Sequence, residues 1–167
     1  MLTSDAKQQK GASDMREILF RGKRLDTGVW ARGDLLRHDG IVSIAWQHPA
    51  DGSMVAPEVD PASIGQFTGL YDSKRTKEYP KGQMIFEGDM LIVTICHSGQ
   101  KIKMRVEWEP YSCMFCLIEG LKLWDVEETA IFNLIQPEAG EEPFQAYEVI
   151  GNVHDAAANH GEGGDGV

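Results

Sequence analysis

The chain has 167 residues, enough for one domain with a single core, and 42% of them are hydrophobic. Its 16 Lys and Arg against 26 Asp and Glu give a net charge of −10, so it offers phosphate backbones and anionic membranes no general attraction. It contains no apolar run of membrane-spanning length and no signal-peptide pattern, and its three cysteines favour a reducing, cytoplasmic setting over a disulfide scaffold.

The two ends differ in composition from the middle of the chain. Residues 1–14 are mostly small and polar, and residues 156–167 are rich in glycine. Because such segments bury little apolar surface, we expect a disordered arm, a single β domain over residues 15–155 and a flexible tail. Met15 would also serve as an internal translation start.

The first elements read as strands. A short apolar run, Arg16–Arg21, is closed by Gly22, and two longer runs, Gly28–His38 and Ile41–Gln47, flank Asp39-Gly40. Asp-Gly between apolar runs is a strong signal for a two-residue hairpin turn. The turn predicts these pairs, in which Leu35, Ile44 and Trp46 share the core face: His38 with Ile41, Arg37 with Val42, Leu35 with Ile44 and Gly33 with Trp46.

The connection from Gln47 to Gln83 holds four of the seven prolines and many polar residues. It predicts a surface loop over residues 48–61, a strand at Ile64–Thr68 and a second polar loop over residues 72–82. The segment Gln66–Leu70 is interpreted as a strand that ends in a glycine turn. A ligand-binding loop is the alternative, but no phosphate-binding glycine pattern supports it.

A second hairpin is predicted from Met90–His97 and Lys101–Glu109, with Ser98-Gly99 as a two-residue turn. Strict alternation in the later strand is typical of a half-buried strand. It predicts that Ile102, Met104, Val106 and Trp108 are buried and that Arg105, Glu107 and Glu109 are exposed. The turn predicts these pairs: Ile95 with Ile102, Val93 with Met104, Leu91 with Val106, Thr94 with Lys103 and Ile92 with Arg105.

Further strands are predicted at Cys113–Ile118 and Ala146–Val153. Residues 125–135 fit either a short helix, capped by Asp125 and ended by Pro137, or a short strand. Many short strands with turn signals between them favour a mainly β fold. We expect a small β-barrel-like or strongly bent antiparallel sheet with long loops and at most one short helix.

Four phrases stand in a specific order along the chain. They are MREILFRGKR followed by Asp26, Gly28 and Trp30; VDPASIGQFTGLYD at Val59–Asp72; IFEGDML at Ile85–Leu91; and YEVIGNVHD at Tyr147–Asp155. In order and spacing they resemble the YopX family of bacteriophage and prophage proteins, from Met15 to about Asp155. The resemblance implies a mostly β fold and a phage or prophage origin. It implies no reaction, cofactor or ligand, so no functional residue is carried over. The basic stretch between Asp72 and Ile85 is longer here than is usual in the family.

The family phrases also have plain structural interpretations. In Glu87-Gly88-Asp89, Gly88 suits a turn with positive φ, and the carboxylates can accept local backbone hydrogen bonds. The functional alternative is a carboxylate pair for acid–base chemistry or metal binding. No histidine or third acid is tied to the pair in sequence, so the structural interpretation is favoured.

Cysteine, histidine and serine give no stronger catalytic signal. Cys96, His97, Cys113 and Cys116 could supply four zinc ligands, but positions three apart on an apolar strand point to opposite faces, and buried free cysteines are favoured. His48, His97 and His154 have no evident partner, and no serine stands in a nucleophile elbow. We therefore expect no enzyme, no catalytic, cofactor-binding or metal-binding residues, and no cofactor.

Two functions of different classes are predicted. The favoured one is a non-enzymatic accessory module, in the cytoplasm of a bacterial host, that binds a host or phage protein through a β scaffold and an acidic surface. The alternative is a small β-barrel that binds nucleic acid, for which Lys74–Lys81 and outward Lys101, Lys103 and Arg105 are the only basic chemistry. A nucleotide hydrolase or nucleotide-binding module is weaker, and a homo-oligomer stays open.

Overall fold

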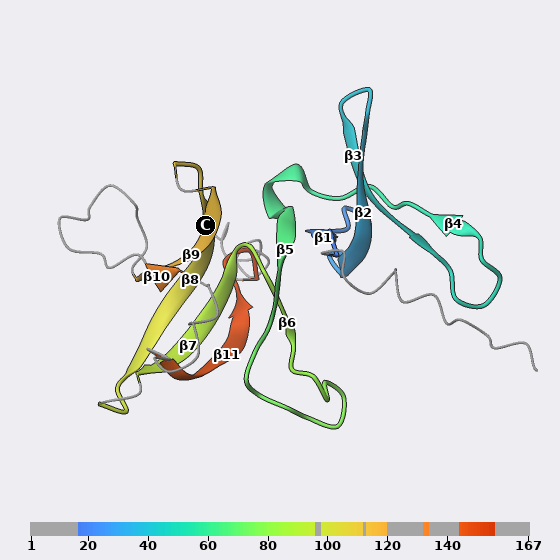
Figure 1. Ribbon diagram of the computed structural model, residues 1–167. Helices are drawn as coiled ribbons and strands as arrows, with labels where there is room; N and C mark the ends of the chain where they lie inside the picture. Colours follow the sequence, from blue (N-terminus) through green and yellow to red (C-terminus); the bar gives the residue numbers. More distant parts are fainter. Residues whose placement is uncertain (1–16, 96–97, 112, 120–131, 134–143, 156–167) are drawn as a thin grey trace, which may run out of the picture.

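A computed structural model describes residues 17–95, 98–111, 113–119, 132–133 and 144–155. These residues form two antiparallel sheets that lie beside each other, with β5 and β6, at one edge of the first sheet, on the side that faces the second sheet (Figure 1). The mainly β prediction is confirmed. In the described residues neither sheet closes into a barrel, so the bent-sheet form of the prediction holds. No described helix has the length and apolar character needed to cross a membrane.

The first sheet has the strand order β4-β3-β2-β1-β5-β6. The second has the order β10-β9-β8-β7-β11. The strands are β1 Phe20–Lys23, β2 Trp30–His38, β3 Ile41–Gln47, β4 Met54–Val55, β5 Gly65–Tyr71, β6 Met84–Phe86, β7 Asp89–Ile95, β8 Lys101–Glu109, β9 Met114–Glu119, β10 Phe132–Asn133 and β11 Phe144–Asn152.

The first hairpin forms in the predicted register. His38 pairs with Ile41 and Leu35 with Ile44, and both turn residues, Asp39 and Gly40, have the positive φ of a two-residue hairpin turn. The ladder ends at Asp34, one pair short of the predicted Gly33–Trp46 pair. At Gly33 the strands lie so close that a Cβ would be 2.0 Å from the carbonyl oxygen of Ala45.

Strand β1 begins later than predicted and runs through Gly22. A Cβ at Gly22 would lie 2.9 Å from a methyl carbon of Val59, so the glycine allows this buried valine to pack on the strand. The core of the first sheet consists of Ala31, Val42, Ile44 and Val59, with Leu35 and Trp46 packed at its edge.

The second hairpin has the predicted strands and faces, but its pairing register is shifted by two residues. Leu91 pairs with Met104 and Val93 with Ile102. The Ile95 N–H donates to the Gln100 carbonyl, so four residues, 96–99, lie between the hydrogen-bonded residues that close the loop, where the prediction had two. Because side chains alternate with period two, a shift of two keeps every side chain on its predicted face. The second core therefore contains the expected residues Leu91, Val93, Met104 and Val106, joined by Ile85, Phe115 and Leu117.

The predicted burial of Trp108 is wrong, since this residue is 42% exposed. It follows Val106, the last core residue of β8, and its ring packs edge-on against Phe115 at a centroid distance of 5.1 Å. Arg105, Glu107 and Glu109, predicted to be exposed, are half-buried.

In the remaining segments, the observed elements agree in large part with those predicted from the sequence. The predicted strand at Ile64–Thr68 is β5, which does not end at a glycine turn but continues past an irregularity near Gly69 to Tyr71. The predicted loop over residues 48–61 contains the short strand β4 and leads into a 3-10 turn at Pro61–Ser63. Of residues 125–135 only Phe132–Asn133 are described, and they are a strand that pairs with β9. The predicted arm and tail lie outside the described residues.

Candidate functional site

The chain passes from the first sheet to the second at the tight turn Glu87-Gly88. Gly88 has the predicted positive φ of 81°. Three backbone hydrogen bonds hold the turn: Glu87 N–H donates to the Gln66 carbonyl at 2.9 Å, Gly88 N–H to the Val106 carbonyl at 2.8 Å, and Val153 N–H to the Gly88 carbonyl at 3.0 Å. The turn is therefore fixed to β5, to β8 and to the segment that follows β11.

Asp89 lies directly after this turn and is only 1% exposed. One of its carboxylate oxygens accepts a hydrogen bond from the Phe86 N–H at 2.8 Å, which confirms the predicted local bond. The other forms an ion pair with Arg21 and accepts from the Asn152 amide at 3.4 Å. Burial raises the pKa of Asp89, and the charge of Arg21 opposes that shift. Both oxygens are therefore used in contacts within the fold. Because Arg21 belongs to β1 and Asn152 to β11, the Asp89 carboxylate connects these two strands to β7.

Aromatic rings enclose the Arg21 guanidinium. The ring centroids of Trp30 and Phe86 each lie 4.6 Å from its central carbon, which is cation–π distance. The Trp30 indole N–H donates to Asp155 at 3.1 Å, and the Lys23 ammonium lies 3.3 Å from the same carboxylate. Burial raises the pKa of Asp155, but the hydrogen bonds from Trp30 and Lys23 outweigh it and leave the pKa below its usual value.

Two other polar residues of the family phrases, Ser63 and Asp72, have similar structural roles. Ser63 accepts a hydrogen bond from the Lys23 backbone N–H at 2.7 Å. Buried Asp72 accepts from the backbone N–H groups of Gln83 at 2.8 Å and Val149 at 3.2 Å, which closes the loop over residues 72–82 against β11. All four phrases therefore contribute residues to the joint between the sheets.

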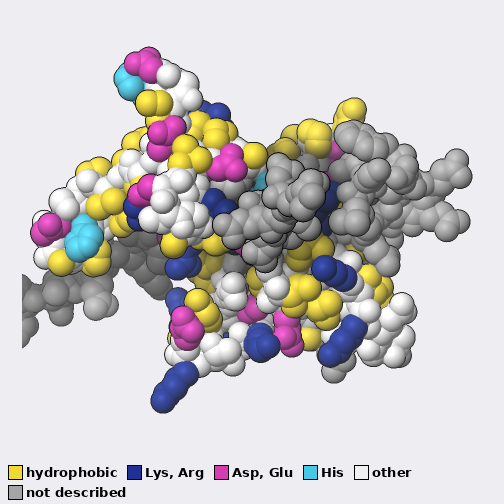
Figure 2. Space-filling view, turned by 180° about the vertical axis from the view of Figure 1, so that it is seen from behind, with side chains coloured by type: hydrophobic (Ala, Val, Ile, Leu, Met, Phe, Trp, Pro, Cys, Tyr) yellow, Lys and Arg dark blue, Asp and Glu magenta, His cyan; other side chains and the backbone are white. Residues whose placement is uncertain are grey.

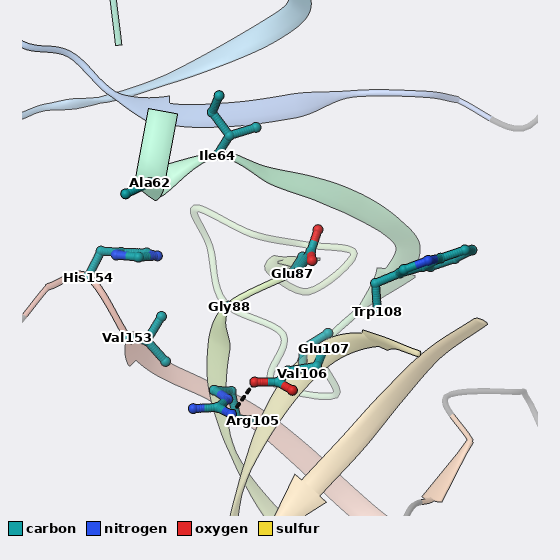
Figure 3. Close-up of a pocket in the computed structure, with 10 residues that line it drawn as sticks. All are labelled: Ala62, Ile64, Glu87, Gly88, Arg105, Val106, Glu107, Trp108, Val153 and His154. Atoms are coloured by element: carbon teal, nitrogen blue, oxygen red, sulfur yellow. Dashed lines mark ion pairs between the residues drawn. The ribbon is translucent and has the colours of Figure 1, made fainter. Parts of the chain in front are cut away.

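A pocket of about 270 Å³ opens beside this joint (Figure 3). Figure 3 shows His154 and Trp108 on opposite sides of it, with Glu87 between them. Its lining is partly apolar and partly charged, with Ala62, Ile64, Glu87, Gly88, Arg105, Val106, Glu107, Trp108, Val153 and His154. The pocket thus combines residues from both sheets around the Glu87-Gly88 turn.

Of the two glutamates that line the pocket, one forms an ion pair and the other does not. Glu107 forms an ion pair with Arg105, its neighbour on the same face of β8. Glu87 has no ion-pair partner among the described residues; burial raises its pKa, a hydrogen bond from the Gln66 backbone opposes the shift, and the charge of Glu107 adds to it. The pocket therefore holds one carboxylate whose charge is not balanced by a nearby cation.

Comparison with known protein families shows that residues 19–158 match the family described as YopX protein. The chain belongs to the YopX family. The match covers most of the chain and confirms the resemblance carried by the four phrases. No curated protein and no solved structure matches the chain.

The residues considered for zinc in this YopX chain are only partly described. Cys113 directly precedes β9 and is exposed, so its predicted burial is wrong. Cys116 is buried as predicted, and burial raises the pKa of its thiol. Cys96 and His97 lie outside the described residues. In the described part of the chain, no three His, Cys, Asp or Glu side chains are close enough to bind a metal ion together.

The structure separates the histidines that were considered as bases. His48 lies 3.4 Å from Asp51 in the loop after β3, while His154 lines the pocket. Sequence reasoning missed the pocket itself and the partners of Asp89. The only sequence signal for Arg21 and Asn152 is that both belong to the family phrases. For Trp108 there is no signal, because the alternation of β8 does not distinguish it from the core residues before it.

Proposed function

We propose that this YopX protein is a phage- or prophage-encoded accessory protein that acts in the host cytoplasm as a non-enzymatic protein-binding module. The pocket beside the joint carries this proposal. It places an exposed tryptophan next to an unbalanced carboxylate, between apolar walls. Protein interfaces concentrate their binding energy at such places, where an aromatic side chain borders a pocket.

The use of the buried polar groups supports a non-enzymatic role. Asp89, Asn152 and Asp72 donate or accept hydrogen bonds that connect strands. A general acid or base must instead be free to exchange a proton with a substrate. Among the described carboxylates, burial raises the pKa of Asp89, whose oxygens are engaged by Arg21, Asn152 and the Phe86 N–H, and that of Glu87, which lines the open pocket.

The distribution of basic residues favours a protein partner over the nucleic-acid alternative. The Lys74 ammonium lies 3.0 Å from Glu148, and Arg105 is paired with Glu107. On the face seen in Figure 2 the Lys and Arg side chains are scattered, with acidic and apolar side chains between them. Because the two ends of the chain carry only two net negative charges, residues 15–155 hold −8 of the −10. Such a body repels a polyanion.

A pull-down from host lysate tests the proposal. The tagged protein and its Trp108→Ser variant are each incubated with lysate, with and without nuclease. We expect proteins that bind the parent after nuclease treatment and are lost with Trp108→Ser. A control variant, Tyr111→Ser, removes a fully exposed ring outside the pocket lining and should retain them. Nucleic acid as the main captured species, or binding unaffected by Trp108→Ser, would contradict the proposal.

A further inference from the structure

We propose that the pocket between the two sheets binds a single Lys or Arg side chain of the partner protein. The inference rests on the proposed function and specifies the chemistry that its binding site recognises. The occupant follows from three properties of the pocket: its charge, its shape and its rigidity.

The charge of the pocket calls for a cation. Glu107 is already balanced by Arg105, whereas Glu87 has no ion-pair partner in the part of the chain that the structure describes. The negative charge of Glu107 also repels that of Glu87. A guest ammonium or guanidinium would remove this repulsion and give Glu87 a charge-assisted hydrogen bond. An anionic guest would meet an unbalanced carboxylate instead.

The shape of the pocket suits a long side chain with a charged end. About 270 Å³ is slightly less than the ~300–1,000 Å³ of typical small-molecule sites, which matches one side chain better than a cofactor. Ala62, Ile64 and Val153 can contact a methylene stem. Trp108 is 42% exposed, so the indole ring is open to a cation–π contact with the charged group.

The turn that carries the acidic group is held in place before a ligand arrives. Glu87 stands on a turn fixed by three backbone hydrogen bonds and by the adjacent ion pair of Asp89 with Arg21. Gly65 lies so close to this turn that a Cβ there would be 2.4 Å from the Glu87 carbonyl oxygen. Because the backbone that carries the acceptor is already fixed, less conformational freedom is lost on binding, which favours recognition of a single side chain.

The test is an NMR titration of the full chain with N-acetyl-arginine amide and N-acetyl-lysine amide, each up to about 50 mM since a single side chain binds weakly. N-acetyl-norleucine amide provides an uncharged stem, and N-acetyl-glutamate amide provides the opposite charge. The Trp108 indole signal, assigned through Trp108→Phe, and the Gly88 amide signal report on the pocket. We expect both to shift with the cationic amides, and at least about tenfold weaker binding of the uncharged one, as loss of a charge-assisted bond implies.

The variants distinguish the parts of the pocket. Glu87→Gln should weaken arginine amide binding about tenfold, and Trp108→Ala about three- to fivefold as expected for an exposed cation–π contact. Glu78→Gln, an exposed glutamate outside the lining, should leave it unchanged. Equal binding of norleucine amide, tighter binding of glutamate amide, displacement of the cation by Mg²⁺, or no binding of any amide would each overturn the inference.

If a nuclease-resistant protein partner depends on Trp108 but not on Glu87, the proposed function stands and this inference fails. If the cationic amides bind but no protein is captured, this inference stands and the proposed function fails.

Discussion

Replacement of Asp89 by asparagine tests the interpretation of the joint between the sheets most directly. The Asp89 side chain is 1% exposed and that of Arg21 10% exposed, so the pair is almost entirely removed from water. Asparagine keeps the size of the side chain and one acceptor oxygen for the Phe86 N–H. Its amide group, however, places two hydrogens where the donors of Arg21 and Asn152 already point. The variant therefore leaves the guanidinium buried and without its anion.

The expected cost is large. Removal of one partner from a buried ion pair destabilises proteins by about 3–5 kcal/mol, because the other charge remains buried and uncompensated. Since small domains are stable by only about 5–15 kcal/mol, Asp89→Asn should come close to unfolding this one. Urea denaturation at pH 7, followed by tryptophan fluorescence and far-UV circular dichroism, measures the change in the free energy of unfolding. An Asp89→Asn protein within about 0.5 kcal/mol of the parent, the range of ordinary surface substitutions, would refute the assignment.

Two further variants keep this prediction measurable if Asp89→Asn fails to fold. Arg21→Lys preserves the positive charge but loses the flat group that lies between Trp30 and Phe86, and should cost about 1–2 kcal/mol. The double replacement Arg21→Met with Asp89→Leu removes both charges, and should be more stable than Asp89→Asn, since apolar replacement of a buried pair is often neutral. A double variant less stable than Asp89→Asn would show that the pair contributes more than charge compensation.

Four other outcomes follow from the same contacts. Gly88 and Gly40 both have a φ of 81°, but a Cβ at Gly88 would lie 3.0 Å from the Asn152 amide while Gly40 faces open space; Gly88→Ala should therefore lose more than the about 1–2 kcal/mol expected for Gly40→Ala, and equal urea midpoints would contradict this. The raised pKa of Glu87 means that its ionised form is disfavoured in the folded state, next to Glu107, Arg105 and His154. Glu87→Gln should match the parent below about pH 4 and gain stability relative to it as the pH rises through the raised pKa, so a difference that does not change with pH is the contrary result. Mixed-sequence DNA should show no binding by fluorescence anisotropy at physiological salt, whereas micromolar binding lost on Lys74→Ala, Arg75→Ala and Lys77→Ala would favour the nucleic-acid alternative. A chain limited to residues 15–157 should keep its thermal midpoint, and a lower midpoint would show that a removed end contributes to the fold.

The strand faces could be predicted from the sequence because alternation with period two is a local property. Alternation along β8 places Met104 and Val106 in the core whatever their partners are. It does not determine the partner, since registers that differ by two residues bury the same side chains. The register depends on the loop between β7 and β8, in which four residues separate the hydrogen-bonded Ile95 and Gln100, whereas the predicted turn Ser98-Gly99 has two.

The end of the core could not be predicted from alternation either. Trp108 continues the apolar pattern of Met104 and Val106, yet the core stops at Val106. Where it stops depends on what packs above the strand, and at Trp108 the first sheet leaves the pocket open. Likewise, Arg21 and Asp89 are 68 residues apart, and nothing local to either shows that they meet.

The two carboxylates of Glu87-Gly88-Asp89 point in different directions from one turn. Asp89 turns inward, where Arg21, Asn152 and the Phe86 N–H use its oxygens. Glu87 turns toward the pocket, where its charge has no ion-pair partner among the described residues. Because the same backbone carries both, the ion pair that fixes Asp89 also fixes the position of Glu87. If the pocket binds a cation as proposed, a variant of Asp89 that still folds should weaken that binding without touching the pocket lining, whereas Trp30→Phe, which keeps a ring on Arg21, should not. The buried ion pair would then contribute both to the stability of the joint and, together with the backbone hydrogen bonds of the turn, to the position of the acidic group in the pocket.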